Sequence, residues 1–283
     1  MISYICLLAT VFANLSCADD MDNSKFDNMI PYGKQEVSYT YPKGEGNLRV
    51  LTFNIRHCAG NDDVINYDRT AAVINGMEPD VVCLQEVDYM TTRSNKVDQL
   101  KTLADKTGMN YYFSKSIAYQ GGEYGNGLLF KGTPISTKTY LLPGAELRSA
   151  AIAEFENYVV ISTHLALEEN NRVESAKQLT DLAKTYNKVV YMAGDFNEDL
   201  MNGTFFTELK KEWEVVSSTE NTFPTGQATK RIDFVVTLKT PPTIVVKSNV
   251  IYNLDGVNVA ITSDHYPLYC DFKKPTGLEE YPK

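Results

Sequence analysis

The segment VVYMAGDFNED, from Val189 to Asp199, joins an apolar β-strand to a polar end. Side chains two positions apart on a strand point to the same face of a sheet, so Asp195 and Asn197 are expected to share one face. Two polar groups arranged in this way either form a turn or line the rim of a functional site. The segment alone leaves both interpretations open.

Other apolar segments also place a polar side chain at a strand end or beside it. These segments are VLTFN, VVCLQE, VVISTH, RIDFVV and AITSDHYP. A turn, a helix cap or a surface ion pair could explain any one of them. The chain has only 3 histidines, however, and two of them belong to this set. The polar side chains in question are Asn54, Glu86, His164, Asp233, Asp264 and His265.

The order of the expected elements indicates an α+β fold. Strand–helix–strand units open the domain and recur near its end, and a run of strands lies between them. Helices are predicted at 67–77, 95–108, 168–187 and 203–213, and Gly108 is a suitable C-cap for the second. Two sheets covered by outer helices fit this order.

Composition divides the chain into four regions. Residues 1–17 are a short apolar run, too short to span a bilayer comfortably, and are predicted to be a secretory signal. Its LSC end resembles a bacterial lipoprotein signal, in which Cys17 would carry the lipid and attach the protein to a membrane. Lipid anchoring, simple secretion and a misassigned start with a cytosolic protein remain open. Residues 18–45 are expected to form a tether or lead-in, 46–273 one large domain and 274–283 a tail.

Charge and cysteine content exclude some classes of site. The net charge of −9 and the pI of about 5.0 disfavour tight non-specific binding to nucleic acid, which needs a field of Lys and Arg. A metal site stays compatible with this charge, because a bound divalent cation supplies local positive charge. Cys58, Cys83 and Cys270 lie in or beside apolar segments at wide spacing, so neither a disulfide framework nor a zinc site is predicted.

The polar set has the chemistry of a hard-metal hydrolase. Asn, Glu and Asp offer oxygen ligands, and no Cys pair or closely spaced His pair accompanies them, which favours Mg²⁺ or Mn²⁺ over structural zinc. Histidines with carboxylates to orient them suit proton transfer and the stabilisation of an anion. Together these groups suit the attack of water on a phosphoester.

Six motifs, in order, extend over nearly all of residues 47–273: TFNI, LQEV, STHL, GDFN, RIDF and SDH. In this respect the chain resembles the endonuclease/exonuclease/phosphatase superfamily of metal-dependent phosphoester hydrolases. The resemblance implies a four-layer α/β sandwich, in which two central mixed β-sheets pack face to face with helices on the outside. It also implies an active site at one edge, where strands of both sheets end.

The resemblance further implies which residues hold the metal and the attacking water. Glu86 corresponds to the principal metal ligand, with Asn54 beside it and Asp264 as a further acidic position near the metal. Asp195 corresponds to the residue that orients or deprotonates the water. Asn197 corresponds to the amide that holds the phosphate or the nucleophile.

Other residues are expected at the phosphate. His265 corresponds to the histidine that contacts the scissile phosphate, and Asp233 to the carboxylate that orients it. His164 is expected to stabilise the charge on phosphorus or to protonate the leaving oxygen. Asn126, in the Gly-rich segment YQGGEYGNGLLF, and Arg148 are substrate-binding candidates, with a hairpin loop and a surface ion pair as their structural alternatives. Further candidates at the mouth are Arg56, His57, Arg93 and Lys96.

The leading functional hypothesis is a Mg²⁺- or Mn²⁺-dependent phosphodiesterase, secreted, periplasmic or attached to the cell surface. Its substrate could be a nucleic acid, a phospholipid head group or a small phosphorylated molecule, and no protein partner is inferred. The alternative is a non-catalytic surface binding protein with the same fold. A carbohydrate-binding β-sandwich would not need polar residues at so many strand ends.

Overall fold

The computed structural model describes residues 38–276. The predicted signal with Cys17, the larger part of the predicted tether and most of the predicted tail therefore lie outside the described residues. Residues 38–43 pack against the folded domain: the Ser38 hydroxyl and the Tyr39 N–H donate hydrogen bonds to the carboxylate of Asp255, and Lys43 pairs with Asp80. The domain thus begins several residues before its first strand.

Two six-stranded mixed sheets form the centre of the domain. The first sheet contains β1 (Asn47–Asn54), β2 (Val81–Tyr89), β3 (Asn110–Tyr119), β4 (Gly122–Phe130), β11 (Val245–Val250) and β12 (Leu268–Lys273), in the order β11-β12-β1-β2-β4-β3. The second contains β5 (Ser136–Leu142), β6 (Arg148–Glu154), β7 (Tyr158–His164), β8 (Val189–Asp195), β9 (Trp213–Val215) and β10 (Asp233–Leu238), in the order β5-β6-β7-β8-β10-β9.

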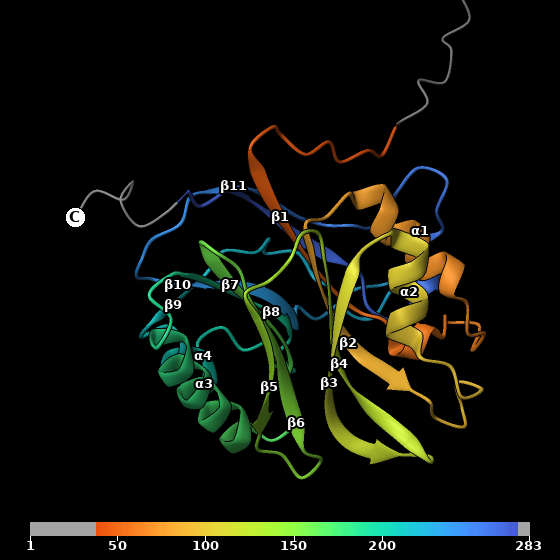
Figure 1. The fold of residues 1–283 in the computed structure, drawn as a ribbon, viewed down its shortest axis with the longest axis horizontal. Coiled ribbons are helices and arrows are strands. Elements are labelled where there is room, and N and C mark those ends of the chain that lie inside the picture. Colours follow the sequence, from red (N-terminus) through yellow and green to blue (C-terminus); the bar gives the residue numbers. More distant parts are fainter. Residues whose placement is uncertain (1–37, 277–283) are drawn as a thin grey trace, which may run out of the picture. The chain divides into compact units, whose positions relative to one another are not determined.

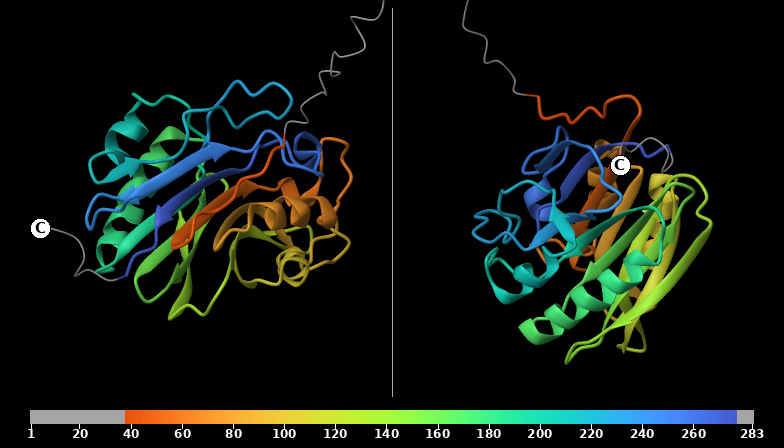
Figure 2. Two further views of the ribbon diagram at one scale, coloured as in Figure 1. Left: turned by 90° about the horizontal axis from the view of Figure 1, so that it is seen from above. Right: turned by 90° about the vertical axis from the view of Figure 1, so that its left-hand side faces the viewer.

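Helices cover the outer face of each sheet (Figure 1). The helices α1 (Tyr67–Met77) and α2 (Gln99–Thr107) lie against the first sheet, and α3 (Glu169–Lys184) and α4 (Thr204–Leu209) lie against the second. Two short helices, η2 (Arg56–Cys58) and α5 (Val259–Thr262), connect strands. The arrangement confirms the predicted four-layer sandwich. The first and last strands of the domain, β1 and β12, are neighbours in one sheet (Figure 2).

Local sequence explains where the first two helices begin and end. The side chain of Asn66 accepts a hydrogen bond from the Arg69 N–H and caps α1, and Asp98 caps α2 in the same way through the Lys101 N–H. Gly108 ends α2 in the left-handed conformation at φ 66°, as the sequence predicts.

The predicted helix at 203–213 is too long. The helix α4 ends at Leu209, and Trp213 begins the short strand β9. Trp213 is fully buried, pairs with Leu238 of β10, and donates its indole N–H to the Thr180 hydroxyl. Burial of one large aromatic ring on the sheet thus outweighs the helical propensity of the preceding residues.

Apolar side chains fill the space between the sheets and the space under the helices. The central strands β1, β2, β7 and β8 are buried along nearly their whole length, which explains their continuous apolar runs. Between the sheets, Tyr191 of β8 packs on Phe272 of β12 with ring centroids 4.4 Å apart. The thiols of Cys58, Cys83 and Cys270 are buried and free, as predicted. Within residues 38–276, no helix has the length and hydropathy needed to cross a bilayer.

Candidate active site

Strand pairing places three predicted residues side by side at the edge of the second sheet. His164 ends β7 and lies directly opposite Asp195 in the parallel pairing of β7 with β8. Asp195 in turn lies opposite Asp233, the first residue of β10, in the antiparallel pairing of β8 with β10. The register of two ladders therefore fixes the order His164, Asp195, Asp233.

The first sheet contributes Asn54 and Glu86 through a local irregularity. Asn54 ends β1 and pairs with Gln85 of β2. The register of β2 against β4 shifts between Leu84 and Val87, and Glu86 within this bulge has a φ of 59°. A bulge redirects side chains, and a non-glycine residue at positive φ costs free energy that the surrounding fold must supply. The Glu86 carboxylate is thereby held next to the Asn54 amide, with Oε1 3.1 Å from Nδ2.

The loop between α5 and β12 brings Asp264 and His265 to the same place. The Ser263 hydroxyl donates a hydrogen bond of 2.7 Å to the backbone carbonyl of Asn54, and it lies 3.3 Å from the His265 N–H. This serine, whose role the sequence did not reveal, ties the loop to the end of β1.

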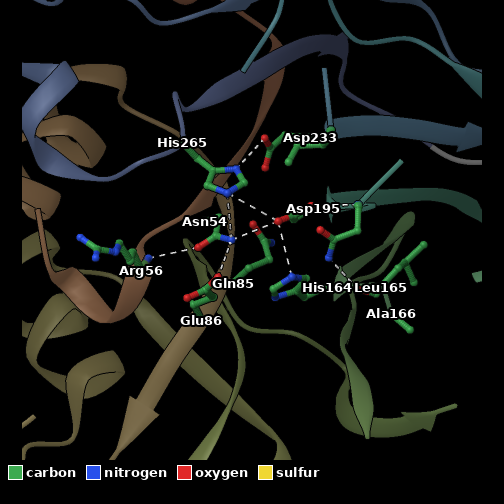
Figure 3. Close-up of polar contacts among 12 residues, drawn as sticks. Asn54, Arg56, Gln85, Glu86, His164, Leu165, Ala166, Asp195, Asp233 and His265 are labelled. Carbon is green, nitrogen blue, oxygen red and sulfur yellow. Dashed lines mark hydrogen bonds and ion pairs between the residues drawn. The ribbon is translucent and has the colours of Figure 1, made fainter. Parts of the chain in front are cut away.

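Asp195 is the centre of the hydrogen-bond network (Figure 3). Its Oδ2 atom lies 3.1 Å from Asn54 Nδ2, 3.5 Å from His164 Nε2 and 3.7 Å from His265 Nε2. Its Oδ1 atom accepts the Asn197 N–H at 2.9 Å. One carboxylate thus contacts groups from both sheets and from the α5–β12 loop. The spatial convergence on which the sequence-based hypothesis depends is present.

Gly194, just before Asp195, allows this close approach. A Cβ atom at this position, where φ is 155°, would lie 1.8 Å from the carbonyl oxygen of Thr163 on β7. Only a residue without a side chain lets β7 and β8 pair at their ends with this conformation.

The carboxylates around His265 favour its protonated form. Burial lowers its pKa, but the charge of Asp233, the hydrogen bond between Nδ1 and Asp233 Oδ2 at 2.9 Å, and the charges of Asp195 and Asp264 together raise the pKa to about 10. The ring of Phe223 packs on the imidazole, with centroids 4.8 Å apart. His265 is therefore a cation at neutral pH whose Nε2 faces Asp195.

His164 has the opposite electrostatic character. Burial lowers its pKa to about 4, and Asp195 offsets this effect only partly because Arg148 and His265 oppose it. Its Nδ1 atom is buried and has no hydrogen-bond partner among the described residues, which suits a neutral ring. The two histidines of the site thus differ in charge at neutral pH.

The depressed pKa of His164 predicts a pH dependence of stability. Between pH 6.5 and about 4 the unfolded chain binds a proton at this ring that the folded protein does not, so the wild type loses stability as the pH falls through this window. Between pH 7.5 and pH 4, the free energy of unfolding of the wild type should fall by about 3 kcal/mol more than that of His164→Gln. This follows because one pKa unit corresponds to about 1.4 kcal/mol. Urea unfolding of both proteins in EDTA at pH 4 and 7.5 measures it. A stability difference that is the same at both pH values contradicts the prediction.

The oxygen groups of the site fit a divalent cation. Among the described residues, Glu86 and Asp264 form no ion pair with a basic side chain. Burial raises the pKa of Glu86, and Asp264 and Asp195 raise it further despite the Asn54 hydrogen bond and His265. Clustered carboxylates without a cationic partner are the donor set of a hard cation such as Mg²⁺ or Mn²⁺. Asn54 now turns its NH₂ toward Glu86 and its Oδ1 toward the Arg56 N–H, so ligation through Oδ1 requires the amide to turn over.

A second group could also hold a metal by geometry: ligand atoms of Asp195, Asp233 and His265 lie within 4.8 Å of one another. In this group, His265 Nδ1 is already hydrogen-bonded to Asp233 Oδ2. Metal ligation through Nδ1 would break this hydrogen bond. We therefore favour the oxygen set of Asn54, Glu86 and Asp264.

A pocket of about 450 Å³ opens over the network. It is lined by both histidines, Glu86, Asp195, Asn197, Asp264 and the nearly buried Arg148, whose Nη1 pairs with Glu146 at 3.0 Å. Asn197 has a φ of 51° and donates Nδ2 to the Leu165 carbonyl. Asp233 lies behind His265 and does not line the pocket.

The prediction that Asn126 contacts substrate is not supported by its position. Its amide is buried under the site, donates to the Ser149 carbonyl at 2.6 Å, and does not line the pocket. Tyr124, two residues earlier on β4, lines it instead. Phe223 and Lys230 also line the pocket, and the sequence analysis did not predict them. The only feature that could have indicated them is their position shortly before the RIDF motif. Of the further candidates at the mouth, none lines this pocket: Arg56, His57, Arg93 and Lys96.

Two face-to-face mixed sheets with carboxylates and histidines at one edge are the arrangement that the resemblance to metal-dependent phosphoester hydrolases implies. A sequence profile of the Endonuclease/Exonuclease/phosphatase family matches residues 51–265. The chain belongs to this family. No curated protein is significantly similar to the chain.

Solved structures share the fold at low identity. An endonuclease/exonuclease/phosphatase from Bacteroides vulgatus has 20% identity and a TM-score of 0.66, with 80% of this chain and 98% of that chain covered. A mannosyl-6-phosphatase from Bacteroides thetaiotaomicron VPI-5482 has 18% identity and a TM-score of 0.64, with 80% and 99% covered. A humanised TDP2 of D. rerio has 21% identity and a TM-score of 0.56, with 81% and 100% covered. At these identities the likeness concerns the fold.

Proposed function

We propose that the protein is a divalent-metal-dependent hydrolase of phosphoesters, with phosphodiesters as its leading substrates. The observation that carries the proposal is the Asp195 carboxylate, which lies within 3.7 Å of Asn54, His164 and His265 in one pocket. Glu86 and Asp264 line the same pocket. A non-catalytic binding protein would not require a carboxylate held between a neutral and a protonated histidine.

The proposed reaction divides the work among these side chains. Asp195 accepts a proton at Oδ2 from the attacking water as the water oxygen bonds to phosphorus, while the Asn197 N–H holds Oδ1. The bond from phosphorus to the leaving ester oxygen breaks, that oxygen takes a proton from solvent, and Asp195 then releases its proton to solvent. The protonated His265 donates from Nε2 to a phosphoryl oxygen, and Asp233 keeps its ring in place. The neutral His164 donates a hydrogen bond to another phosphoryl oxygen. Groups fixed before the reaction need little reorganisation as negative charge develops on the phosphate.

The cation would be held by Glu86, Asp264 and, after its amide turns, Asn54. A bound Mg²⁺ or Mn²⁺ neutralises phosphate charge and polarises the phosphoryl oxygen. The charge of the pocket supports a diester. Arg148 is paired with Glu146, and three carboxylates face the cavity near the metal site, so a diester monoanion meets less repulsion than a monoester dianion.

The test compares bis(4-nitrophenyl) phosphate with 4-nitrophenyl phosphate, each with Mg²⁺, Mn²⁺ or EDTA. We expect metal-dependent release of nitrophenol, faster from the diester. Faster hydrolysis of the monoester would assign the pocket to a phosphatase. No hydrolysis of either compound with any metal would favour the binding protein.

We also propose that the protein is exported and attached to a membrane through a lipid on Cys17. The support is the sequence of residues 1–17, which lie outside the described residues. Metabolic labelling with a radioactive fatty acid tests it: the wild type should incorporate label and Cys17→Ser should not. Label in both proteins, or in neither, would contradict lipid attachment at Cys17.

A further inference from the structure

A second, smaller pocket opens beside the first one. It has a volume of about 120 Å³, and its walls are Arg93, Ile117, Tyr119, Tyr124 and Glu146. Tyr124 and Glu146 also line the main pocket, so the two cavities share a wall. The two cavities are therefore adjacent, and a substituent of a phosphate in the main pocket needs to pass only Tyr124 and Glu146 to enter the side pocket.

The guanidinium of Arg93 is fixed in the wall of the side pocket. It donates two hydrogen bonds to the fully buried Asp88 carboxylate, from Nε at 2.7 Å and from Nη2 at 2.9 Å. Its plane covers the rings of Tyr119 and Tyr124, at 4.7 and 5.6 Å from the ring centroids. The second terminal nitrogen, Nη1, takes no part in the pair with Asp88 and is available as a donor.

The walls of the side pocket are preformed. The β3–β4 hairpin turns at Gln120 and Gly121, both at positive φ (44° and 73°), as a tight two-residue turn requires. The backbone carbonyl of Gln120 accepts the Thr92 N–H, and its side-chain oxygen accepts the Arg93 N–H, each at 3.0 Å. The loop that carries Arg93 is thus tied to the hairpin that carries both tyrosines.

The side pocket offers hydrogen-bonding groups around a small apolar surface. Glu146 accepts hydrogen bonds, Arg93 donates them, the tyrosine hydroxyls do both, and Ile117 supplies a non-polar contact. Liquid water occupies about 30 Å³ per molecule, so the volume corresponds to about four waters, or to part of one six-membered ring. The Arg93 guanidinium lies over one face of each tyrosine ring, which leaves less aromatic surface on which a nucleobase could stack. An acyl chain would bury charged walls without partners.

We propose that the side pocket binds a polyhydroxylated ring, such as a sugar or a cyclitol, carried as an ester substituent of the substrate phosphate. The proposal rests on the proposed function, because the main pocket must hold the phosphate. The ring hydroxyls bond to Glu146, Arg93 and the Tyr119 hydroxyl. The protein thereby selects phosphoesters of hydroxylated rings.

Two diesters that differ only in ring hydroxyls test the proposal: the 4-nitrophenyl diesters of the glucose 6-hydroxyl and of cyclohexylmethanol. We expect kcat/KM to be at least tenfold higher for the glucose diester in the wild type. Tyr119→Ala should reduce this preference to less than threefold, mainly through KM, and Tyr119→Phe should give an intermediate value. Tyr111→Ala, which removes an exposed tyrosine from the same strand, should keep the full preference.

The outcomes separate this proposal from the proposed function. Equal hydrolysis of the two diesters by the wild type, or a preference unchanged in Tyr119→Ala, overturns the side-pocket assignment while leaving the hydrolase in place. Binding of both diesters to Asp195→Asn with Mg²⁺, measured by calorimetry, repeats the comparison without turnover. Equal affinity there overturns the assignment even if no hydrolysis is detected.

Discussion

Asp195→Asn should lower kcat on bis(4-nitrophenyl) phosphate by about 10³-fold or more, with a small change in KM. Removal of a single preorganised group at a reacting centre typically costs about 10²–10³ in rate. The loss for Asp195 should lie at or above the upper end of this range, because its carboxylate contacts both histidines and Asn54. An amide has nearly the same shape as the carboxylate but cannot accept the proton of water at neutral pH.

The control for this variant is Asp199→Asn, which removes the same charge from the same pocket but lies outside the hydrogen-bond network of Asp195. Its rate should stay within about tenfold of the wild type. Melting temperatures of both variants should remain within a few degrees of the wild type, because each substitution preserves shape. Near-wild-type turnover by folded Asp195→Asn would refute its role as the base.

Removal of the metal should have an effect of comparable size. EDTA should reduce hydrolysis to the rate of the uncatalysed reaction, and Mg²⁺ or Mn²⁺ should restore it, because the cation supplies several kcal/mol of charge stabilisation. Glu86→Gln should raise the Mg²⁺ concentration for half-maximal activity by at least about tenfold, since even residues that only orient metal ligands contribute 10- to 100-fold to affinity. A Mg²⁺ titration of wild type and variant measures both effects.

Glu146→Gln is the matched control, because Glu146 lines the same pocket but pairs with Arg148. Its half-maximal Mg²⁺ concentration should match that of the wild type. If Glu86→Gln leaves the titration unchanged, the cation is held elsewhere, and the cluster of Asp195, Asp233 and His265 becomes the alternative.

The sequence predicted those parts of the fold and the candidate site that depend on local patterns. Continuous apolar runs identified β1, β2, β7 and β8, and three of these strands end in a polar residue of the site. Glu86 instead lies in a bulge of β2, and Asn197 lies beyond the end of β8 at a φ of 51°, so strand alternation does not place these two side chains. The ladder register then brings His164, Asp195 and Asp233 together without any further signal in the sequence.

Features that depend on long-range geometry escaped prediction. The positive φ of Glu86 follows from a bulge in the pairing of β2 with β4, and no neighbouring residue in the sequence predicts this bulge. Asn126 and Tyr124 lie two positions apart on one strand, and a bulge in the pairing of β3 with β4 lies next to Tyr124. Only packing shows which of them reaches the cavity. Trp213 forms a strand because β10 offers it a buried partner, which helix propensity cannot foresee.

The position of β12 between β11 and β1 has a consequence for synthesis of the chain. β1 is made first and pairs with β12 only after more than two hundred residues have left the ribosome, so one of its edges stays open until the end. His265 arrives on that same final segment, next to β12. A nascent chain that ends before His265 therefore lacks both an inner strand of the first sheet and one of the histidines that line the main pocket.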